Sequence, residues 1–371
     1  MASELSHLVP DPLRRAGLWS AYLLLTLAGA LALLYLIVRL RILVIPIFVA
    51  LLITTLLAPP VQKLRARGWK PMLATWTVLL AAILLITAIF AVLIPQFTGQ
   101  VDEMRTSARE GFDEVVTWLG EGPLELSEQE ITDYLDQAGQ RLQENSEQIT
   151  GGILAGATKT FEFIAGILLV FVLVFFFLKD GPGIADWFRR QVKRDNRRHV
   201  DEIGRRAWST LSAYVRGTAV IALVDAVLIG LALALVGNPL WIPLGVLTFF
   251  GAFFPIVGAV VAGALVALVT LVTNGFTPAL IITGVIVAIQ QIEGDVLQPI
   301  VMGKAVRLHP VVILIALTAG GVLGGIAGAF VAVPVAAVAA NVGNYVKLQV
   351  RDEKDLTDKD KEATKETSRE P

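Results

Sequence analysis

The chain has 371 residues, of which 55% are hydrophobic and only 17% are charged, and its mean hydropathy is +0.69. A soluble protein of this length carries more charge, so the composition argues against a soluble domain and indicates a polytopic membrane protein. The absence of cysteine excludes disulfide bonds, a thiol nucleophile and a cysteine metal site.

Five apolar runs of near-spanning length come first along the chain. They cover 18–38, 42–58, 71–95, 153–178 and 209–236. About 20 apolar residues suffice to cross the hydrocarbon core, so we expect a transmembrane helix in each run. The first run follows the short segment 1–17 with Arg14 and Arg15, and it is longer than a signal-peptide core, so we interpret it as an uncleaved span. The three spans of 18–95 would form a membrane scaffold.

The charges of the connecting segments orient these spans, although the net charge of the whole chain is only −1. Segment 179–208 carries nine Lys and Arg residues, whereas 96–152 carries three against thirteen Asp and Glu. Positively charged connections stay on the cytosolic side, so we expect 179–208 to be a basic cytosolic loop and both chain ends to be cytosolic. Arg39 and Arg41 fall on the outer side in this scheme, against the rule.

The acidic segment 96–152 is long enough to form a small domain of its own. Its apolar residues recur at intervals of three and four, which is typical of two amphipathic helices. Between them lies GEGPLELSEQE, where Ser127 and Glu130 have the spacing of a capping box. We expect an extracytoplasmic helical hairpin that packs on the membrane domain or makes oligomer contacts.

Proline and glycine repeatedly interrupt the apolar sequence of the C-terminal half. The run 240–273 is too long for one ordinary span, and Pro255 lies in its middle, so we expect a break near Phe254 between two half-length helices. The stretch 311–346 is interrupted in the same way by glycines 320, 321, 324, 325 and 328 and then Pro334. Non-helical backbone in a bilayer must be surrounded by protein or an aqueous cavity, so such breaks point to a substrate path. The alternative is that the glycines simply allow close helix packing.

These patterns define the expected fold class, an all-α polytopic membrane protein with about eight hydrophobic membrane elements, some of them discontinuous or re-entrant. A fourth span at 153–178 would precede a transport unit at 209–346. Six full spans with two re-entrant hairpins, or eight full spans, both return the chain to the cytosol. The final residues, 347–371, are almost purely charged, and we expect a disordered cytosolic tail.

Asp225 lies deep within the fifth apolar run, in AVIALVDAVLIGLALAL. A carboxylate there costs about 2.5–3.5 kcal/mol on insertion scales, so its side chain should face a wet cavity or a partner rather than lipid. Arg216 is roughly 13 Å away along a helix, too far for a direct pair. We expect an ion or proton site, with a structural counter-charge as the alternative.

The decapeptide QQIEGDVLQP is unusually polar for a segment between two apolar stretches. Its glutamines, Gln290, Gln291 and Gln298, offer hydrogen-bond donors and acceptors, and Glu293 and Asp295 flank a glycine. A loop of this chemistry could bind a polyhydroxylated solute or carry a proton. The alternative is a solvated cytoplasmic loop, in which charges are ordinary.

Other functional classes find little support in the sequence. His309 has no second ligand nearby, so no metal site is expected, and VMGKAV lacks the glycine spacing and the Ser or Thr of a Walker A motif. No nucleophile elbow or paired-histidine zinc motif occurs. We therefore expect neither an ATP-driven pump nor an enzyme, and no cofactor. The basic residues at 189–206 suit anionic lipid rather than nucleic acid.

Three stretches resemble the autoinducer-2 exporter family of bacterial permeases. They are QQIEGDVLQPIVMGKAVRLHP with the glycine-rich run after it, FFFLKDGPG at 175–183 and FFPIVGAVVAG at 253–263. The resemblance covers roughly 15–350. The family often has a tyrosine after the break proline and a proline after the next glycine. Here these positions are Ile256 and Ala259, so a cargo that contacts that tyrosine would not carry over.

The resemblance implies a bacterial inner-membrane transporter that exports small molecules, in some members a quorum-sensing signal, while other members are sodium/proton antiporters. It also implies a homo-oligomer, a pentamer, and an elevator-like motion of the re-entrant half against the scaffold. Carried onto this sequence, the transport residues are Pro255, Gly258, Gln290, Gln291, Glu293, Gln298, Pro299, Gly303 and Pro310.

We therefore expect a secondary transporter whose partners are a small-molecule or ion substrate and the lipid bilayer. Gln and Glu side chains would bind the solute, and Asp225, Glu293 and Asp295 would couple protons or ions. Two alternatives stay open. One is sodium/proton antiport, which needs no organic solute. The other is a membrane scaffold or regulatory protein that acts through the outer hairpin and the basic loop.

Overall fold

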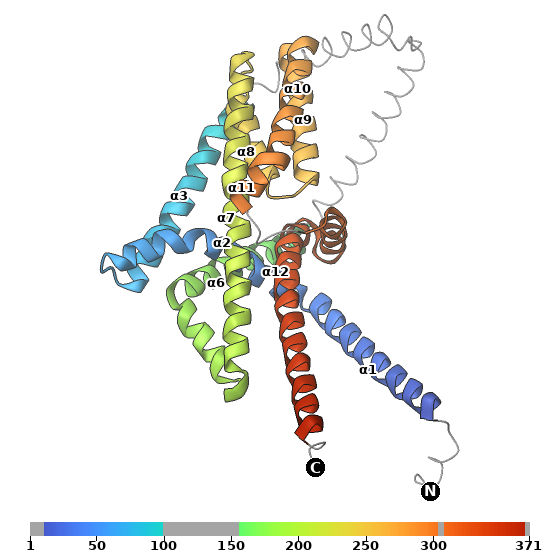
Figure 1. The fold of residues 1–371 in the computed structure, drawn as a ribbon. Coiled ribbons are helices and arrows are strands. Elements are labelled where there is room, and N and C mark those ends of the chain that lie inside the picture. Colours follow the sequence, from blue (N-terminus) through green and yellow to red (C-terminus); the bar gives the residue numbers. More distant parts are fainter. Residues whose placement is uncertain (1–10, 99–155, 303–307, 368–371) are drawn as a thin grey trace, which may run out of the picture.

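The computed structural model describes residues 11–98, 156–302 and 308–367, which are helical over almost their whole length (Figure 1). Seven of the described helices are long and apolar enough to cross a membrane, and two shorter apolar helices accompany them. This confirms the all-α polytopic fold class. The hairpin expected at 96–152 lies almost entirely outside the described residues.

The described part of the first half of the chain contains four helices. They are α1 (Asp11–Arg39), α2 (Arg41–Ala66), α3 (Pro71–Thr98) and α6 (Gly156–Arg190). Helices α2, α3 and α6 share a buried core, which we call the scaffold core: Ala50, Ala58, Val61, Ala74, Val78, Leu79, Val174 and Leu178. Small side chains on α2 let α6 approach closely.

Helix α7 (Arg197–Leu235) is a long helix that runs from the level of α8, α9 and α10 down past α2 and α6 (Figure 1). At one end it packs against α8 (Trp241–Gly251) and α10 (Phe276–Ile292), and both of these contact α9 (Val257–Asn274). Their contact forms a second core, which we call the bundle core: Ile229, Leu233, Leu240, Leu244, Val266, Ile282, Ile286 and Ile289. The scaffold and this bundle thus have separate hydrophobic cores.

The break between α8 and α9 lies where the sequence predicts it. Helix α8 ends at Gly251 and α9 begins at Val257, with Pro255 in the turn between them. Eleven residues make α8 about 16 Å long, which is about half of a bilayer core. A Cβ on Gly258 would collide with the Gly251 carbonyl, so glycine is required where the two helices meet.

Helix α12 (Pro310–Thr367) is broken at Gly325, whose φ of 61° and ψ of −146° are not helical. The two arms fold back on each other and approach so closely that a Cβ on Gly320 would collide with the Gly328 carbonyl. This supports the predicted break, and it also supports close packing as the role of these two glycines. Pro334 stays inside the second arm. A third core joins α2, α7 and α12: Leu52, Leu211, Tyr214, Val215, Leu317, Val331 and Val333.

Three expectations about irregular segments were wrong. The polar decapeptide is not a loop, because a π-helical turn, η3 (Glu293–Leu297), joins α10 to α11 (Gln298–Met302). The basic segment 179–208 is mostly helical, as α6 and α7 extend into it. Residues 347–367 continue α12 rather than being disordered. Lys, Glu and Ala favour helix, and the apolar part of α12 already provides the nucleus that a short charged peptide lacks.

Candidate functional site

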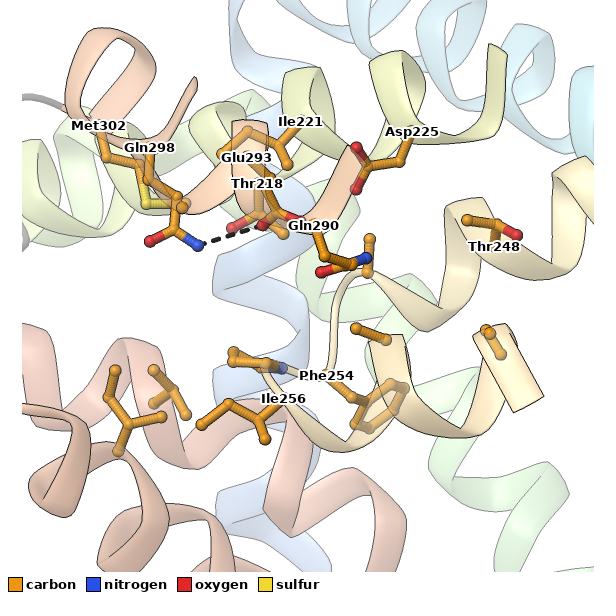
Figure 2. A pocket seen from close by; sticks show the side chains of 18 of the residues that line it. Thr218, Ile221, Asp225, Thr248, Phe254, Ile256, Gln290, Glu293, Gln298 and Met302 are labelled. Carbon is orange, nitrogen blue, oxygen red and sulfur yellow. Dashed lines mark hydrogen bonds between the residues drawn. The ribbon is translucent and has the colours of Figure 1, made fainter. Parts of the chain in front are cut away.

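A cavity of about 370 Å³ lies where the broken elements meet α7. Side chains from α7, the α8–α9 turn, the α10–α11 segment and α12 line it (Figure 2). It sits between the bundle core and the core that joins α2, α7 and α12. Two irregular backbone segments contribute to its wall. They are the turn at Pro255 and the π-helical turn that begins at Glu293.

Helix α7 supplies one wall through residues spaced by three and four. Tyr214, Thr218, Ile221, Asp225 and Ile229 all line the cavity, because this spacing places them on one helical face. The Asp225 side chain is only 2% exposed. Within the described residues, neither its Oδ1 nor the Thr218 Oγ1 has a hydrogen-bond partner. Buried polar atoms of this kind can accept a hydrogen bond from water or a ligand, or can bind an ion.

The segment from α10 to α11 supplies the facing wall. Gln290, Glu293 and Gln298 point into the cavity in Figure 2, and the Gln298 Nε2 donates a hydrogen bond to the Glu293 Oε1 at 3.1 Å. The π-helical turn begins at Glu293, and such turns occur frequently at functional sites. The carboxyl groups of Glu293 and Asp225 are close enough to interact electrostatically.

The turn after α8 forms an apolar floor. Phe254 and Ile256 lie below the polar side chains in Figure 2. Ile256 has φ 67° and ψ −60°, and the Val257 N–H donates to the Pro255 carbonyl at 2.8 Å, so these residues form a γ-turn. This geometry is strained for a β-branched residue. Thr248 of α8 also lines the cavity, and its hydroxyl donates to the Leu244 carbonyl.

The structure brings six of the proposed site residues together in this cavity. They are Pro255, Gln290, Glu293, Gln298, Pro310 and Asp225. Four others do not line it. Gly258 is buried at the α8–α9 contact, Pro299 is exposed, and the exposed Gln291 donates a hydrogen bond to Asp295 at 2.7 Å. Gly303 lies outside the described residues.

Several lining residues did not emerge from the sequence. Tyr214 and Thr218 share a helical face with Asp225, so the spacing from that carboxylate could have identified them. Thr248 and Met302 come from other elements, and no local pattern distinguishes them from packing residues. Only the tertiary arrangement brings these two to the cavity.

The lining chemistry suits a polar solute. Carboxyl, amide and hydroxyl groups provide donors and acceptors on facing walls, while Ile221, Ile256 and Met302 provide apolar surface. In the described part of the lining there is no Lys or Arg. Nor do the described residues contain a group of three His, Cys, Asp or Glu side chains that could hold a metal ion.

Comparisons with known proteins place the sequence among membrane transporters. The sequence model of AI-2E family transporters matches residues 22–347. The protein MT0215 of Mycobacterium tuberculosis is 36% identical over 338 residues, 91% of this chain and 92% of its own length. The AI-2 transport protein TqsA of Escherichia coli is 24% identical, over 78% of this chain and 82% of its own length. YrrI of Bacillus subtilis is 28% identical over half of this chain and 53% of its own length.

Proposed function

The chain belongs to the AI-2E family of membrane transporters, and from this premise we propose that it exports a small polar organic solute through the cavity beside Asp225. One observation carries the proposal: polar side chains from α7 and from the α10–α11 segment face each other across a cavity at the broken helices. Discontinuous helices commonly form solute sites in secondary transporters. The name of TqsA makes AI-2 a first candidate solute.

Proton coupling is the second part of the proposal. Asp225 and Glu293 both line the cavity and interact electrostatically. Two neighbouring carboxylates repel each other, and a bound proton relieves that repulsion. A proton taken up or released as solute binds would therefore link solute movement to the pH gradient. Asp295, whose side chain is exposed and bonded to Gln291, has no such role in this scheme.

An elevator-like motion is the third part. The scaffold of α2, α3 and α6 has its own core, and so does the bundle of α7 to α10. Bodies with separate cores can move relative to each other without unpacking. The interface between them, around Leu52, Tyr214 and Leu317, is where the shift would occur. The cavity lies at this interface, and the side chains that α7 and α10 contribute to its wall would move with the bundle.

We place the protein in the bacterial inner membrane as a homo-oligomer, a pentamer by family resemblance. The charge distribution supports cytosolic ends, because the nine basic residues of 179–208 favour the cytosolic side. The helical extensions of α6 and α7 would carry these charges into the cytosol. Arg189 and Asp201 link the two extensions through an ion pair of 3.5 Å.

The proposal is tested in proteoliposomes that report internal pH. Sodium is added first and AI-2 or other polyhydroxylated solutes afterwards, to the wild type and to Glu293→Gln. The matched control is Asp295→Asn, a carboxylate two positions away that points out of the cavity. We expect a solute-driven pH change in the wild type and the control, and a loss of about tenfold or more in Glu293→Gln, because a hydrogen-bonded charge is removed.

Sodium/proton antiport is the second candidate, and the unpartnered oxygens of Asp225 and Thr218 favour it, since both could ligate a small cation. It predicts that sodium alone collapses a pH gradient, without organic solute. Equal solute-driven signals in Glu293→Gln and the wild type would contradict the carboxylate's role. Silence with every solute and with sodium, together with an intact fold, would favour a scaffold or regulatory protein instead.

A further inference from the structure

Arg39 and Arg41 lie at the junction of α1 and α2, and the proposed function gives them no role. They flank Leu40, where two apolar helices meet, so they are placed at the end of both apolar segments. In the part of the chain that the structure describes, neither guanidinium has a carboxylate within ion-pair distance. In the expected topology they lie on the outer side of the membrane, where basic residues are less frequent than on the cytosolic side. Two exposed arginines at the end of two apolar helices form a cationic point that attracts an anionic lipid headgroup.

Three hollows meet at Arg41. A long groove of about 920 Å³ runs between α2, α6 and the Gly325 turn, and its lining is almost wholly apolar apart from Arg41. A short groove of about 340 Å³ runs on the other side, between α2 and both arms of α12. A third, more polar hollow is formed by Tyr35, Val38, Arg39, Arg41 and Ile42.

We propose that this junction binds one anionic diacyl phospholipid. Its phosphate pairs with Arg39 and Arg41 in the polar hollow, and one acyl chain lies in each apolar groove. Arginine matches phosphate oxygens with paired, charge-assisted hydrogen bonds. The branching of two apolar grooves from one cationic point corresponds to the shape of a two-chained lipid, and not to that of a soluble anion or a single fatty acid.

The lipid would contact the turn of α12. Gly324 and Gly325 line the long groove, and Gly320 and Gly328 line the short one. Ile45 lies between the grooves and lines both, and a Cβ on Gly324 would be 2.5 Å from its Cδ1. The turn is therefore held against α2 at the point where the two acyl chains separate. A bound lipid packs against both sides of this contact and stabilises it.

The headgroup is tested with delipidated protein in a neutral detergent. We measure the concentration of phosphatidylglycerol that gives the half-maximal rise in Tm, and compare phosphatidylcholine with the same chains. In the double variant Arg39→Gln/Arg41→Gln this concentration should rise about 30-fold, since each basic residue near a lipid surface contributes about 1 kcal/mol. The control Lys63→Gln/Arg65→Gln removes the same charge from the other end of α2 and should change nothing.

The acyl grooves are tested separately. Gly166 lines the long groove, and a Cβ there meets nothing within 4 Å, so the side chain of Gly166→Leu would project into the groove. It should weaken phosphatidylglycerol binding, whereas Gly181→Leu, equally open on the same helix, should not. Soluble glycerophosphate should not raise Tm.

Three results would overturn the proposal. The first is an equal response of the double arginine variant and the wild type. The second is an equal response to phosphatidylcholine and phosphatidylglycerol. The third is a change in oligomeric state caused by Gly166→Leu with lipid binding intact, because a second copy of the chain would then cover the groove. None of these measurements depends on transport, so the proposal can fail without the proposed function failing.

Discussion

Asp225 stands among apolar residues on a membrane helix, where a carboxylate costs about 2.5–3.5 kcal/mol to insert. The structure gives this residue a polar setting. Its side chain faces a cavity that Thr218, Gln290 and Glu293 also line, and at 2% exposure the residue is kept away from lipid. A carboxylate that is this costly to insert indicates a functional site. Here Asp225 and Glu293 are the two carboxylates that line the cavity.

Ile256 allows a direct test of the cavity floor. A β-branched residue at positive φ stores about 1–3 kcal/mol, and glycine at this position removes the strain at an entropic cost of about 0.5–1 kcal/mol. Ile256→Gly should therefore leave the apparent Tm unchanged or raise it. The neighbouring Val257→Gly, which begins a regular helix, should lower it. Equal losses in both variants would contradict the strained turn.

For single residues, the sequence predicts cavity-lining positions where a polar side chain interrupts an apolar segment. Asp225, Glu293 and Gln290 were identifiable because polar groups in apolar sequence need a partner. The strain at Ile256 was not, because isoleucine rarely adopts positive φ and its type favours strand or helix. Gln291 and Asp295 were as polar as the true lining residues. Only the helical phase set by the π-helical turn separates them from Glu293 and Gln298.

The helix pair α8–α9 is held together by a close approach of backbone. A Cβ on Gly258 would overlap the Gly251 carbonyl, so Gly258→Ala must push the two helices apart, at a cost of about 1–3 kcal/mol. The control is Gly284→Ala on α10, where the new methyl group meets nothing and helix propensity improves by about 1 kcal/mol. Thermal unfolding should move in opposite directions for the two variants. A Gly258→Ala protein as stable as the control would refute the contact.

Helices α2 and α7 are joined by an unusual hydrogen bond. Pro59 lies inside α2 and has no N–H, so the Thr55 carbonyl one turn earlier lacks its helical donor. The Arg216 Nε on α7 donates to this carbonyl at 3.1 Å. The guanidinium thus satisfies a backbone group that proline leaves free, and it links the scaffold to the bundle.

This bond predicts coupling between Arg216 and Pro59. Arg216→Ala should destabilise the wild type by about 1.5–3 kcal/mol, the usual value for a hydrogen bond to a charged group. The same change in a Pro59→Ala background should cost less, because the alanine N–H can donate to Thr55. A double-mutant cycle of unfolding free energies measures the difference, and strictly additive losses would show that the two residues do not share the carbonyl.

At the element scale, the sequence predicts where a helix must stop better than which glycine makes a turn. Pro255 lacks a donor and clashes with the preceding turn, so the break after α8 follows from its chemistry. Five glycines surround the second break, and any of them tolerates the geometry that Gly325 adopts. The helical tail was missed because charge alone indicates disorder, whereas α12 supplies a folded segment from which the helix can continue.

In the whole molecule, two bodies with separate cores meet along α2, α7 and α12, and the cavity lies beside this interface. The account requires that solute reach the cavity from water. Because the chain has no cysteine, a single introduced thiol can report on that access without any background. The measurement needs no knowledge of the cargo.

The most direct test compares two buried threonines in the same region. Thr248 lines the cavity and is 6% exposed, whereas Thr270 is 0% exposed, does not line it, and makes the same hydrogen bond to its own helix. We would measure the rate at which a membrane-impermeant thiosulfonate labels Thr248→Cys and Thr270→Cys in proteoliposomes. The account predicts rapid labelling of Thr248→Cys, slowed by a transported solute, and no labelling of Thr270→Cys. Equal resistance of both variants would show that water and solute do not reach the cavity, and would contradict its role as the transport path.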